Sequence, residues 1–233
     1  MFGRTRLTLR DRVNGDSLLG VVAYRSTERT ETRRLEARER VIAAATDLIA
    51  AGGYRAASVA AVAAQANLAT GSVYRHFPSK TDLFAEVFRR AAQREVDVAG
   101  DAMGASAPAA ERLTGGVQTF ARRALRGGRL AWALIAEPVD PAVEDERLQF
   151  RRAYRDLFAD VLRDGIAAGE LPEQDVELAA AAMVGAIGEA LVGPLAPSPG
   201  RRTPDRFVDG LVAFCLRSVT DEEHGRVGDP AAA

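Results

Sequence analysis

Cysteine and histidine are scarce in this sequence, and their scarcity limits the chemistry that the protein can carry out. Cys215 is the only cysteine among 233 residues, which excludes an internal disulfide and favours a reducing, cytoplasmic location. The two histidines, His76 and His224, lie in no spacing that is typical of a metal site or a catalytic triad. No glycine-rich phosphate loop is present either. The sequence therefore predicts no enzyme, no metal and no cofactor.

Long apolar runs and strand-like alternation are also lacking. No uninterrupted apolar stretch approaches the roughly 18 residues of a membrane span, so we expect no membrane partner. Hydrophobic residues make up 47% of the chain, enough for a sizeable core, and they recur at helical spacing. We therefore predict an all-α protein of about nine helices. Two of these, at 109–125 and 129–137, are separated by Gly127 and Gly128.

Lysine is the rarest basic residue, because Lys80 stands alone against 30 arginines. It opens a helix that Ser79 caps, where a cation opposes the helix dipole at a cost of roughly 0.3–1 kcal/mol. A contact between this ammonium group and a DNA phosphate would offset that cost. A solvated surface lysine is the alternative explanation.

Net charge is near zero, yet its distribution is uneven. Residues 1–95 contain 16 basic and 10 acidic residues, a net charge of +6, whereas residues 96–233 contain 15 basic and 22 acidic residues, a net charge of −7. A basic N-terminal part and an acidic remainder are typical of a protein with one end that faces DNA.

A helix-turn-helix pattern lies between Ser58 and Lys80. Val59 and Val62 belong to the apolar face of a short first helix, and Ser58 is placed to cap that helix through its hydroxyl. Asn67 follows, a residue type that tolerates the left-handed conformation of a sharp turn. The pattern predicts two short helices joined by a tight turn, the usual geometry for reading the major groove.

The second helix of this pattern, residues 70–77, has the side chains of a DNA-reading surface. It ends before Pro78, because a proline disfavours α geometry in the residue before it. Small polar, aromatic and cationic groups suit the wall of a DNA groove better than a protein core. The residues of this helix that we predict to contact DNA are Thr70, Gly71, Ser72, Tyr74, Arg75 and His76.

The run of residues 38–88 resembles the DNA-binding domain of the TetR/AcrR family of bacterial repressors. The matching features are Gly53-Tyr54 after the first helix, Ser58 opening the second, Tyr74, His76 and Phe77 ending the third, and Ser79-Lys80 opening the fourth. The resemblance implies phosphate contacts for Ser58, Tyr74, His76 and Lys80, and base contacts for Thr70, Gly71 and Ser72. One departure is that Asn67-Leu68-Ala69 replaces the usual Gly-Val-Ser, which removes the common serine cap of the recognition helix.

We expect four regions along the chain. Residues 1–34 form an Arg-rich extension that is expected to be disordered; alternatively, Arg33 and Arg34 belong to an arm along the phosphate backbone or minor groove. Residues 35–80 form the three-helix DNA-binding domain, whose first helix covers about 35–51. Residues 81–220 form a larger helical domain for ligand binding and dimerisation, and residues 221–233 form a disordered tail.

Aromatic residues, only 6% of the chain, gather on the middle helices of the larger domain. Taken singly, each ring is best explained as ordinary core. Together, bulky rings on neighbouring helices are also typical of a small-molecule pocket, and the resemblance implies an effector site here. The pocket residues that we predict are Phe120, Trp132, Ile135, Phe150, Tyr154 and Phe158.

The helix expected at 173–192 is too apolar for the surface of a monomer. Burial within the protomer is one explanation. A dimer interface of two helices per chain is the explanation that we favour, because a helix-turn-helix protein needs two heads for a two-fold operator, and the resemblance implies the same. The predicted interface residues are Met183, Gly185, Gly188, Leu191, Phe207, Leu211 and Phe214.

These features predict a ligand-responsive, DNA-binding transcriptional regulator. We expect a repressor that a small apolar or aromatic effector releases from a pseudo-palindromic operator, while an activator of the same design is an open alternative. The expected partners are double-stranded operator DNA, an effector and a second copy of the chain. A pure protein-interaction module is less favoured, because Tyr74, His76 and Lys80 are expected to converge on one surface.

Overall fold

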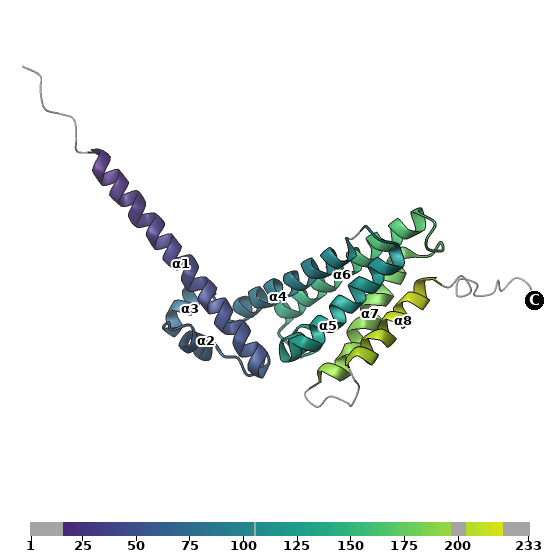
Figure 1. Ribbon diagram of the computed structural model, residues 1–233. Helices are drawn as coiled ribbons and strands as arrows, with labels where there is room; N and C mark the ends of the chain where they lie inside the picture. The colour runs from purple at the N-terminus through teal and green to yellow at the C-terminus, as the bar shows by residue number, and fades with distance from the viewer. Residues whose placement is uncertain (1–15, 105, 197–203, 221–233) are drawn as a thin grey trace, which may run out of the picture. The chain divides into compact units, whose positions relative to one another are not determined.

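The computed structural model describes residues 16–104, 106–196 and 204–220, and within these ranges the helices are joined by turns and loops, with no strand (Figure 1). The eight helices are α1 (Asp16–Gly52), α2 (Val59–Gln65), α3 (Thr70–His76), α4 (Lys80–Met103), α5 (Ala109–Ile135), α6 (Pro141–Ala167), α7 (Val176–Leu195) and α8 (Pro204–Thr220). The all-α prediction is confirmed, with eight helices in the described part instead of about nine.

The difference in number comes from the two glycines at which we expected a helix to end. Gly128 has the dihedral angles φ 52° and ψ −119°, which are not helical, but the helix resumes at once and α5 continues to Ile135. Glycine adopts a positive φ without steric cost, so it allows an interruption that the flanking turns then span. The segments expected at 109–125 and 129–137 are therefore one interrupted helix.

The first helix begins earlier than we expected. The prediction of disorder for residues 1–34 is wrong for residues 16–34, which belong to α1; residues 1–15 and the predicted tail 221–233 lie outside the described residues. No proline interrupts residues 16–34, and a helix without an apolar stripe can still be supported by close pairs of opposite charge, such as Arg34 and Glu31 at 3.7 Å. Residues 1–40 and 41–233 form two separate units.

The helix-turn-helix packs around its own core within the second unit. This core joins the end of α1, α2, α3 and the first half of α4, and its members include Ile49, Tyr54, Val62, Val73 and Phe84. The local signals are confirmed. The Ser58 hydroxyl accepts a hydrogen bond from the backbone N–H of Ala61 at 3.1 Å, and Asn67 has the left-handed φ of 55°.

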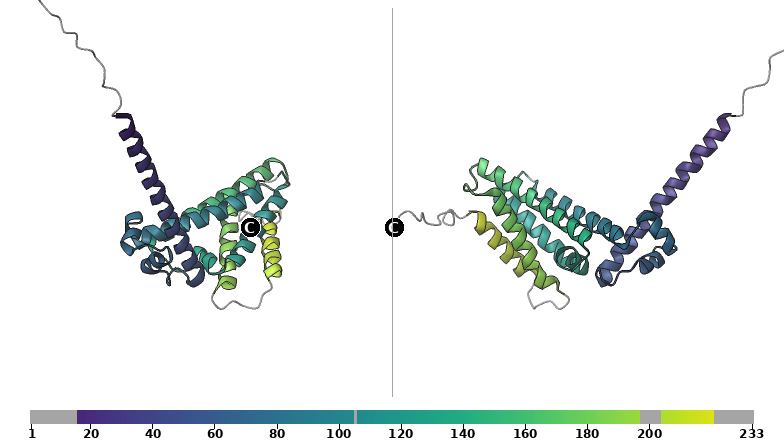
Figure 2. Two further views of the ribbon diagram at one scale, coloured as in Figure 1. Left: turned by 60° about the vertical axis from the view of Figure 1, so that its left-hand side comes forward. Right: turned by 180° about the vertical axis from the view of Figure 1, so that it is seen from behind.

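A second core fills the bundle of α4 to α8. Helix α4 packs against α5 and α6, α7 packs against α5 and α6, and α8 packs against α5 and α7. Helices α7 and α8 lie side by side in each view of Figure 2. The largest fully buried side chains of this core are Met103, Leu113, Tyr154, Phe158, Leu162, Met183, Ile187 and Leu191.

The two cores share helices, so the helix-turn-helix core does not end at residue 80. Helix α4 contributes Phe84 to the first core and Met103 to the second. The end of α5 and the start of α6 supply Leu134 and Val143 to the core of the DNA-binding head. Elements of the larger bundle are therefore built into the head.

Among the described helices, α7 alone is long and apolar enough to span a membrane by length and composition. Only 28% of its apolar window is buried inside the protomer. One face, with Met183, Ile187 and Leu191, packs in the core, whereas Leu178 is 67% exposed. Exposed apolar faces of this kind are typical of surfaces that bind a partner.

Candidate functional site

Helix α3 presents the predicted DNA-reading side chains on the face opposite its buried Val73. Tyr74 is 47% exposed, and Thr70, Gly71 and Arg75 are exposed as well. A side chain at Gly71 would meet nothing within 4 Å, so a DNA backbone or base edge can approach closely there. Ser72 and His76 are half-buried beside them.

The start of α3 lacks a side-chain cap, as the departure at residues 67–69 leads us to expect. Its N-cap residue is Ala69, which offers no hydrogen bond to the first turn. The Ser72 hydroxyl instead accepts a hydrogen bond from Arg75 Nη2 at 2.7 Å. These two side chains are therefore linked on the surface that is predicted to face bases.

Lys80 lies at the junction between the head and α4. Its Nζ atom is 5.1 Å from the ring centroid of Tyr54 and 5.3 Å from that of Phe84, within the range of cation–π attraction. Ser79 caps the same helix, since its hydroxyl accepts from the backbone N–H of Asp82 at 3.0 Å. The ammonium group is thus held half-buried at a fixed place, and the predicted phosphate contact starts from an ordered side chain.

Arg33 and Arg34 are both exposed on the part of α1 that belongs to the first unit. Ser58 is exposed at the start of α2, and its hydroxyl is already engaged in capping. The DNA contacts of these three residues stay predictions.

A cleft between α4, α5 and α6 is lined mainly by apolar side chains. Its empty volume is about 430 Å³, which includes open solvent at its mouth. Three rings line it in edge-to-face or tilted contact: the centroid of Tyr154 is 4.5 Å from that of Phe120 and 4.9 Å from that of Phe150. We call this space the aromatic cleft. Its lining residues are Glu95, Phe120, Arg123, Ala124, Gly127, Leu130, Ala131, Leu134, Ile135, Phe150 and Tyr154.

The polar groups of the aromatic cleft are paired with one another. Arg123 donates from Nη2 to Glu95 Oε1 at 2.8 Å, and this hydrogen bond raises the pKa of the guanidinium. The Tyr154 hydroxyl donates to the backbone carbonyl of Glu95 at 3.0 Å, and burial raises the pKa of this phenol, which stays neutral. The cleft therefore offers an apolar wall with one ion pair at its edge.

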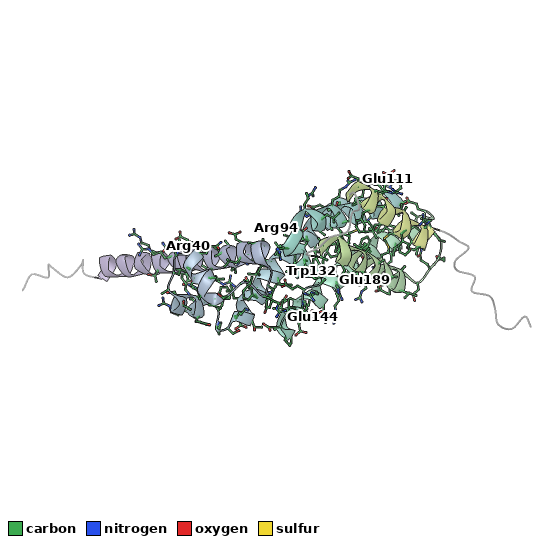
Figure 3. The ribbon with its side chains drawn as sticks, turned by 90° about the horizontal axis from the view of Figure 1, so that it is seen from below. Arg40, Arg94, Glu111, Trp132, Glu144 and Glu189 are labelled. Atoms are coloured by element: carbon green, nitrogen blue, oxygen red, sulfur yellow. The ribbon has the colours of Figure 1, made fainter. Side chains whose placement is uncertain are left out.

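Four of the six predicted pocket residues line the aromatic cleft, and two do not. Phe120, Ile135, Phe150 and Tyr154 line it. Phe158 is fully buried in the bundle core, and Trp132, labelled in Figure 3, is partly buried against the same core. Helical spacing placed Phe158 beside Tyr154, but only the tertiary packing determines which ring borders open space.

The predicted dimer residues divide in the same way. Met183, Leu191, Phe207 and Leu211 are buried in the protomer core, so the prediction that their side chains face a partner is wrong. Phe214 is 53% exposed. Gly185 and Gly188 border open space, since a side chain at either would meet nothing within 4 Å.

A buried carboxylate that we did not predict connects the bundle to the head. Glu137 follows α5 and is 7% exposed; it accepts hydrogen bonds from the backbone N–H of Tyr54 at 2.9 Å and of Arg55 at 3.4 Å. Gly53 has a φ of 82°, and a Cβ there would lie 3.0 Å from Glu137 Oε1. The glycine thus permits both the turn and the close approach of the carboxylate.

Two more side chains strengthen this connection. The Tyr54 hydroxyl donates a hydrogen bond to Asp140. Burial is the main cause that raises the pKa of Tyr54, and the hydrogen bond to Asp140 is the next largest. Arg147, 8% exposed, donates to the carbonyls of Ala133, Leu134 and Glu137 at 2.7–3.0 Å. Burial lowers the pKa of Arg147, against the opposing effect of Glu144. We call Glu137 and Asp140 the acidic bridge.

Comparisons with known proteins agree with this geometry. Residues 41–87 match the family described as bacterial regulatory proteins of the tetR family, and residues 106–191 match the tetracyclin repressor-like C-terminal domain. The chain belongs to the TetR family. It is accordingly a helix-turn-helix transcriptional regulator. All lining residues of the aromatic cleft except Glu95 lie in the part that matches the family's C-terminal domain.

Named TetR-family relatives are transcriptional regulators rather than enzymes. The fatty acid metabolism regulator protein of Bacillus subtilis (strain 168) is 26% identical over 159 residues, which are 65% of this chain and 79% of that protein. The transcriptional repressor KstR of Mycobacterium tuberculosis (strain ATCC 25618 / H37Rv) is 28% identical over 152 residues, which are 64% and 69% of the two chains.

Solved structures of TetR-family regulators have the same fold. FadR from Bacillus subtilis, in complex with stearoyl-CoA, has a TM-score of 0.68 at 21% identity and covers 77% of this chain and 98% of its own. RolR, in complex with resorcinol, has a TM-score of 0.63 at 21% identity and covers 84% and 93%. At 21% identity, the similarity to these two structures shows a shared fold and nothing more.

Proposed function

We propose that this TetR-family protein is a cytoplasmic, dimeric repressor that a small apolar or aromatic effector releases from its operator. Residues 35–80 carry the DNA-binding surface, and residues 81–220 bind the effector and a second copy of the chain. Two copies of α3 enter successive major grooves of a pseudo-palindromic site, with centres ~34–36 Å apart for one helical turn.

Leu134 supports release by a ligand, because this one side chain belongs both to the cleft and to the DNA-binding head. It lines the aromatic cleft and also packs in the core of the DNA-binding head. Glu137 follows three residues later and holds the backbone of Tyr54. A ligand that displaces the last turn of α5 therefore displaces the acidic bridge and the turn that it holds.

Helix α4 provides a second route. Glu95 lines the aromatic cleft, and Lys80 at the start of the same helix is the predicted phosphate contact. An effector shifts the equilibrium only if it binds one arrangement of these helices better than the other. The cleft and the head are joined by rigid elements, as such a shift requires.

The exposed faces of α7 and α8 support a dimer. The glycines of α7 allow another helix to approach closely, and Phe214 on α8 is half exposed without a partner in the protomer core. A two-fold dimer presents two heads to a two-fold operator. Glu177 and Glu189 within α7 also suit a protein interface better than a lipid bilayer.

The chemistry of the aromatic cleft supports an apolar or aromatic effector. Two structural relatives hold ligands of these kinds, stearoyl-CoA in FadR and resorcinol in RolR. Three rings in contact provide both stacking faces and apolar surface.

A gel shift tests the proposed function directly. The protein should bind DNA that flanks its own gene more tightly than random DNA of the same length. Raising the salt to about 0.5 M should abolish both interactions, because phosphate contacts release counterions. A protein that prefers neither DNA, or binds none, would contradict the proposal.

Lys80→Ala should weaken binding to operator and to random DNA by about the same factor. The slope of log affinity against log salt should fall by about one unit, because one phosphate contact is lost. Arg94→Ala removes an exposed charge elsewhere on α4 and is the matched control (Figure 3). An unchanged slope would remove Lys80 from the interface.

Thr70→Ala and Ser72→Ala should instead change base preference, with little effect on random DNA. Selection of bound sequences from a random DNA pool measures this preference. Ser72→Ala also frees Arg75 from its hydrogen bond, so the larger change is expected for that variant. Profiles identical to those of the wild type would show that α3 does not read bases through these positions.

A further inference from the structure

A groove between α6 and α7 carries three arginines. Arg151, Arg152 and Arg155 come from α6, and Glu189 of α7, labelled in Figure 3, is the single acidic residue that lines it. The groove measures about 1020 Å³ with its open mouth included. The other lining residues are small or apolar: Ile135, Leu148, Ala181, Val184, Gly185, Gly188 and Val192. We call this space the arginine groove.

The arginines of this groove are short of anionic partners. Within the described residues Arg151 and Arg152 form no ion pair, and the Nε atom of Arg155 is buried without a hydrogen bond. The nearest carboxylate oxygen to that atom, on Asp156, is 3.9 Å away, too far for a hydrogen bond. By contrast Arg163 of the same helix pairs with two carboxylates at 2.6 Å. A buried donor without an acceptor costs free energy, so the Nε–H of Arg155 is not stabilised by the protomer itself.

The arginine groove and the aromatic cleft both adjoin a third space of about 330 Å³, open solvent included, because each shares lining residues with it. That space shares Phe120, Leu134, Ile135, Phe150 and Tyr154 with the cleft, and Ile135, Arg151, Val184 and Gly188 with the groove. Ile135 lines all three. The apolar lining of the cleft and the arginines of the groove therefore border neighbouring spaces of the same bundle.

We propose that the effector is an amphipathic anion, whose apolar part fills the aromatic cleft and whose phosphate or carboxylate end binds Arg151, Arg152 and Arg155. Arginine presents paired N–H donors in a plane that matches the oxygens of these two anions. The proposal rests on the proposed function, because it takes the aromatic cleft as the effector site. An uncharged molecule of the same apolar shape should therefore be a poor effector.

A carboxylate of a second copy of the chain is the competing partner for these arginines, since the groove borders the exposed face of α7. The lining residues that the groove and the cleft share with the space next to both of them favour the ligand. A partner helix that rests on the glycines of α7 would cover the groove from outside, whereas a ligand would occupy the groove together with the adjoining cleft. The competing explanation makes a separate prediction, because it requires the arginines for dimerisation.

Binding of two matched probes tests the proposal. Dodecyl phosphate and dodecanol have the same apolar chain and differ in the anionic end; both are titrated calorimetrically below their aggregation concentrations. Wild-type protein should bind dodecyl phosphate at least about tenfold more tightly than dodecanol, as expected for charge-assisted hydrogen bonds. Dodecanoate and stearoyl-CoA, used as further arms, distinguish a carboxylate from a phosphate-bearing end.

The double variant Arg152→Gln, Arg155→Gln should lose about tenfold or more in affinity for dodecyl phosphate and keep its affinity for dodecanol. Arg122→Gln, an exposed arginine of α5 outside the groove, is the matched control and should bind both probes like the wild type. Circular dichroism and sedimentation velocity confirm that each variant stays folded and keeps its oligomeric state.

Three results would overturn the proposal. Equal binding of the two probes would remove the anion site but leave the proposed function intact, and binding of neither probe would contradict both the anion site and the effector cleft. A double variant that becomes a monomer would assign the arginines to the dimer interface. If dodecyl phosphate binds through the arginines yet leaves operator binding unchanged, the anion site stands and the ligand-released repression fails.

Discussion

Glu137→Ala should lower both the thermal stability of the protein and its affinity for the operator. The substitution leaves the backbone N–H of Tyr54 buried without its acceptor, which costs about 1–3 kcal/mol. For a protein of this size that loss lowers Tm by roughly 3–10 °C. Because Tyr54 carries the ring on which Lys80 rests, operator affinity should fall as well, even at temperatures where the variant is fully folded.

Two controls separate positioning from a general loss of stability. Glu137→Gln keeps one acceptor oxygen and should recover part of the Tm and of the operator affinity. Asp145→Ala removes an equal charge from an exposed position of α6 and should behave as wild type. Calorimetry and a gel shift at 20 °C measure the two quantities. A Glu137→Ala protein with unchanged Tm and operator affinity would show that the acidic bridge does not hold the head.

Gly185→Arg should convert the protein from a dimer to a monomer. Among the described residues, a Cβ added at this position would meet no atom within 4 Å beyond the backbone of its own helix. Replacing a mid-helix glycine also favours the helix by up to about 1 kcal/mol, so the protomer should still fold. Across a two-fold axis, however, the substitution brings two cations together and buries them, at a cost of several kcal/mol per ion. Operator affinity should fall far more than affinity for random DNA.

Sedimentation velocity gives the oligomeric state directly. Phe214→Arg tests the same interface from α8, without entering the arginine groove. Asp101→Arg places an equal cation at an exposed position of α4 and should leave the dimer intact. If Gly185→Arg and Phe214→Arg both remain tight dimers on the operator, the interface must involve another pair of helices.

Local interactions explain why the helix-turn-helix could be predicted so fully from the sequence. The cap at Ser58 and the left-handed turn at Asn67 each depend on residues within a few positions along the chain. The same reasoning could not decide whether Gly128 ends a helix or only interrupts it. That outcome depends on whether the flanking turns find a common packing surface, which one segment does not reveal.

Interactions between distant segments explain what the sequence did not reveal. Glu137 contacts Tyr54 across 83 positions of the chain, and nothing near Glu137 distinguishes it from a solvated acid beside a proline. An all-round apolar helix such as α7 also gives no indication of which face turns inward, so Met183 and Leu191 were assigned to the wrong side. Composition identified the helix but not its orientation.

The length of α4 determines how little movement is needed to end DNA binding. Fifteen residues separate Lys80 from Glu95, so the predicted phosphate contact lies roughly 22 Å along the helix axis from the aromatic cleft. A tilt of only about 8° at Glu95 then carries Lys80 through roughly 3 Å, a full hydrogen-bond length. If the two copies of α4 in a symmetric dimer tilt in opposite directions, the distance between their Lys80 residues changes by up to twice this displacement.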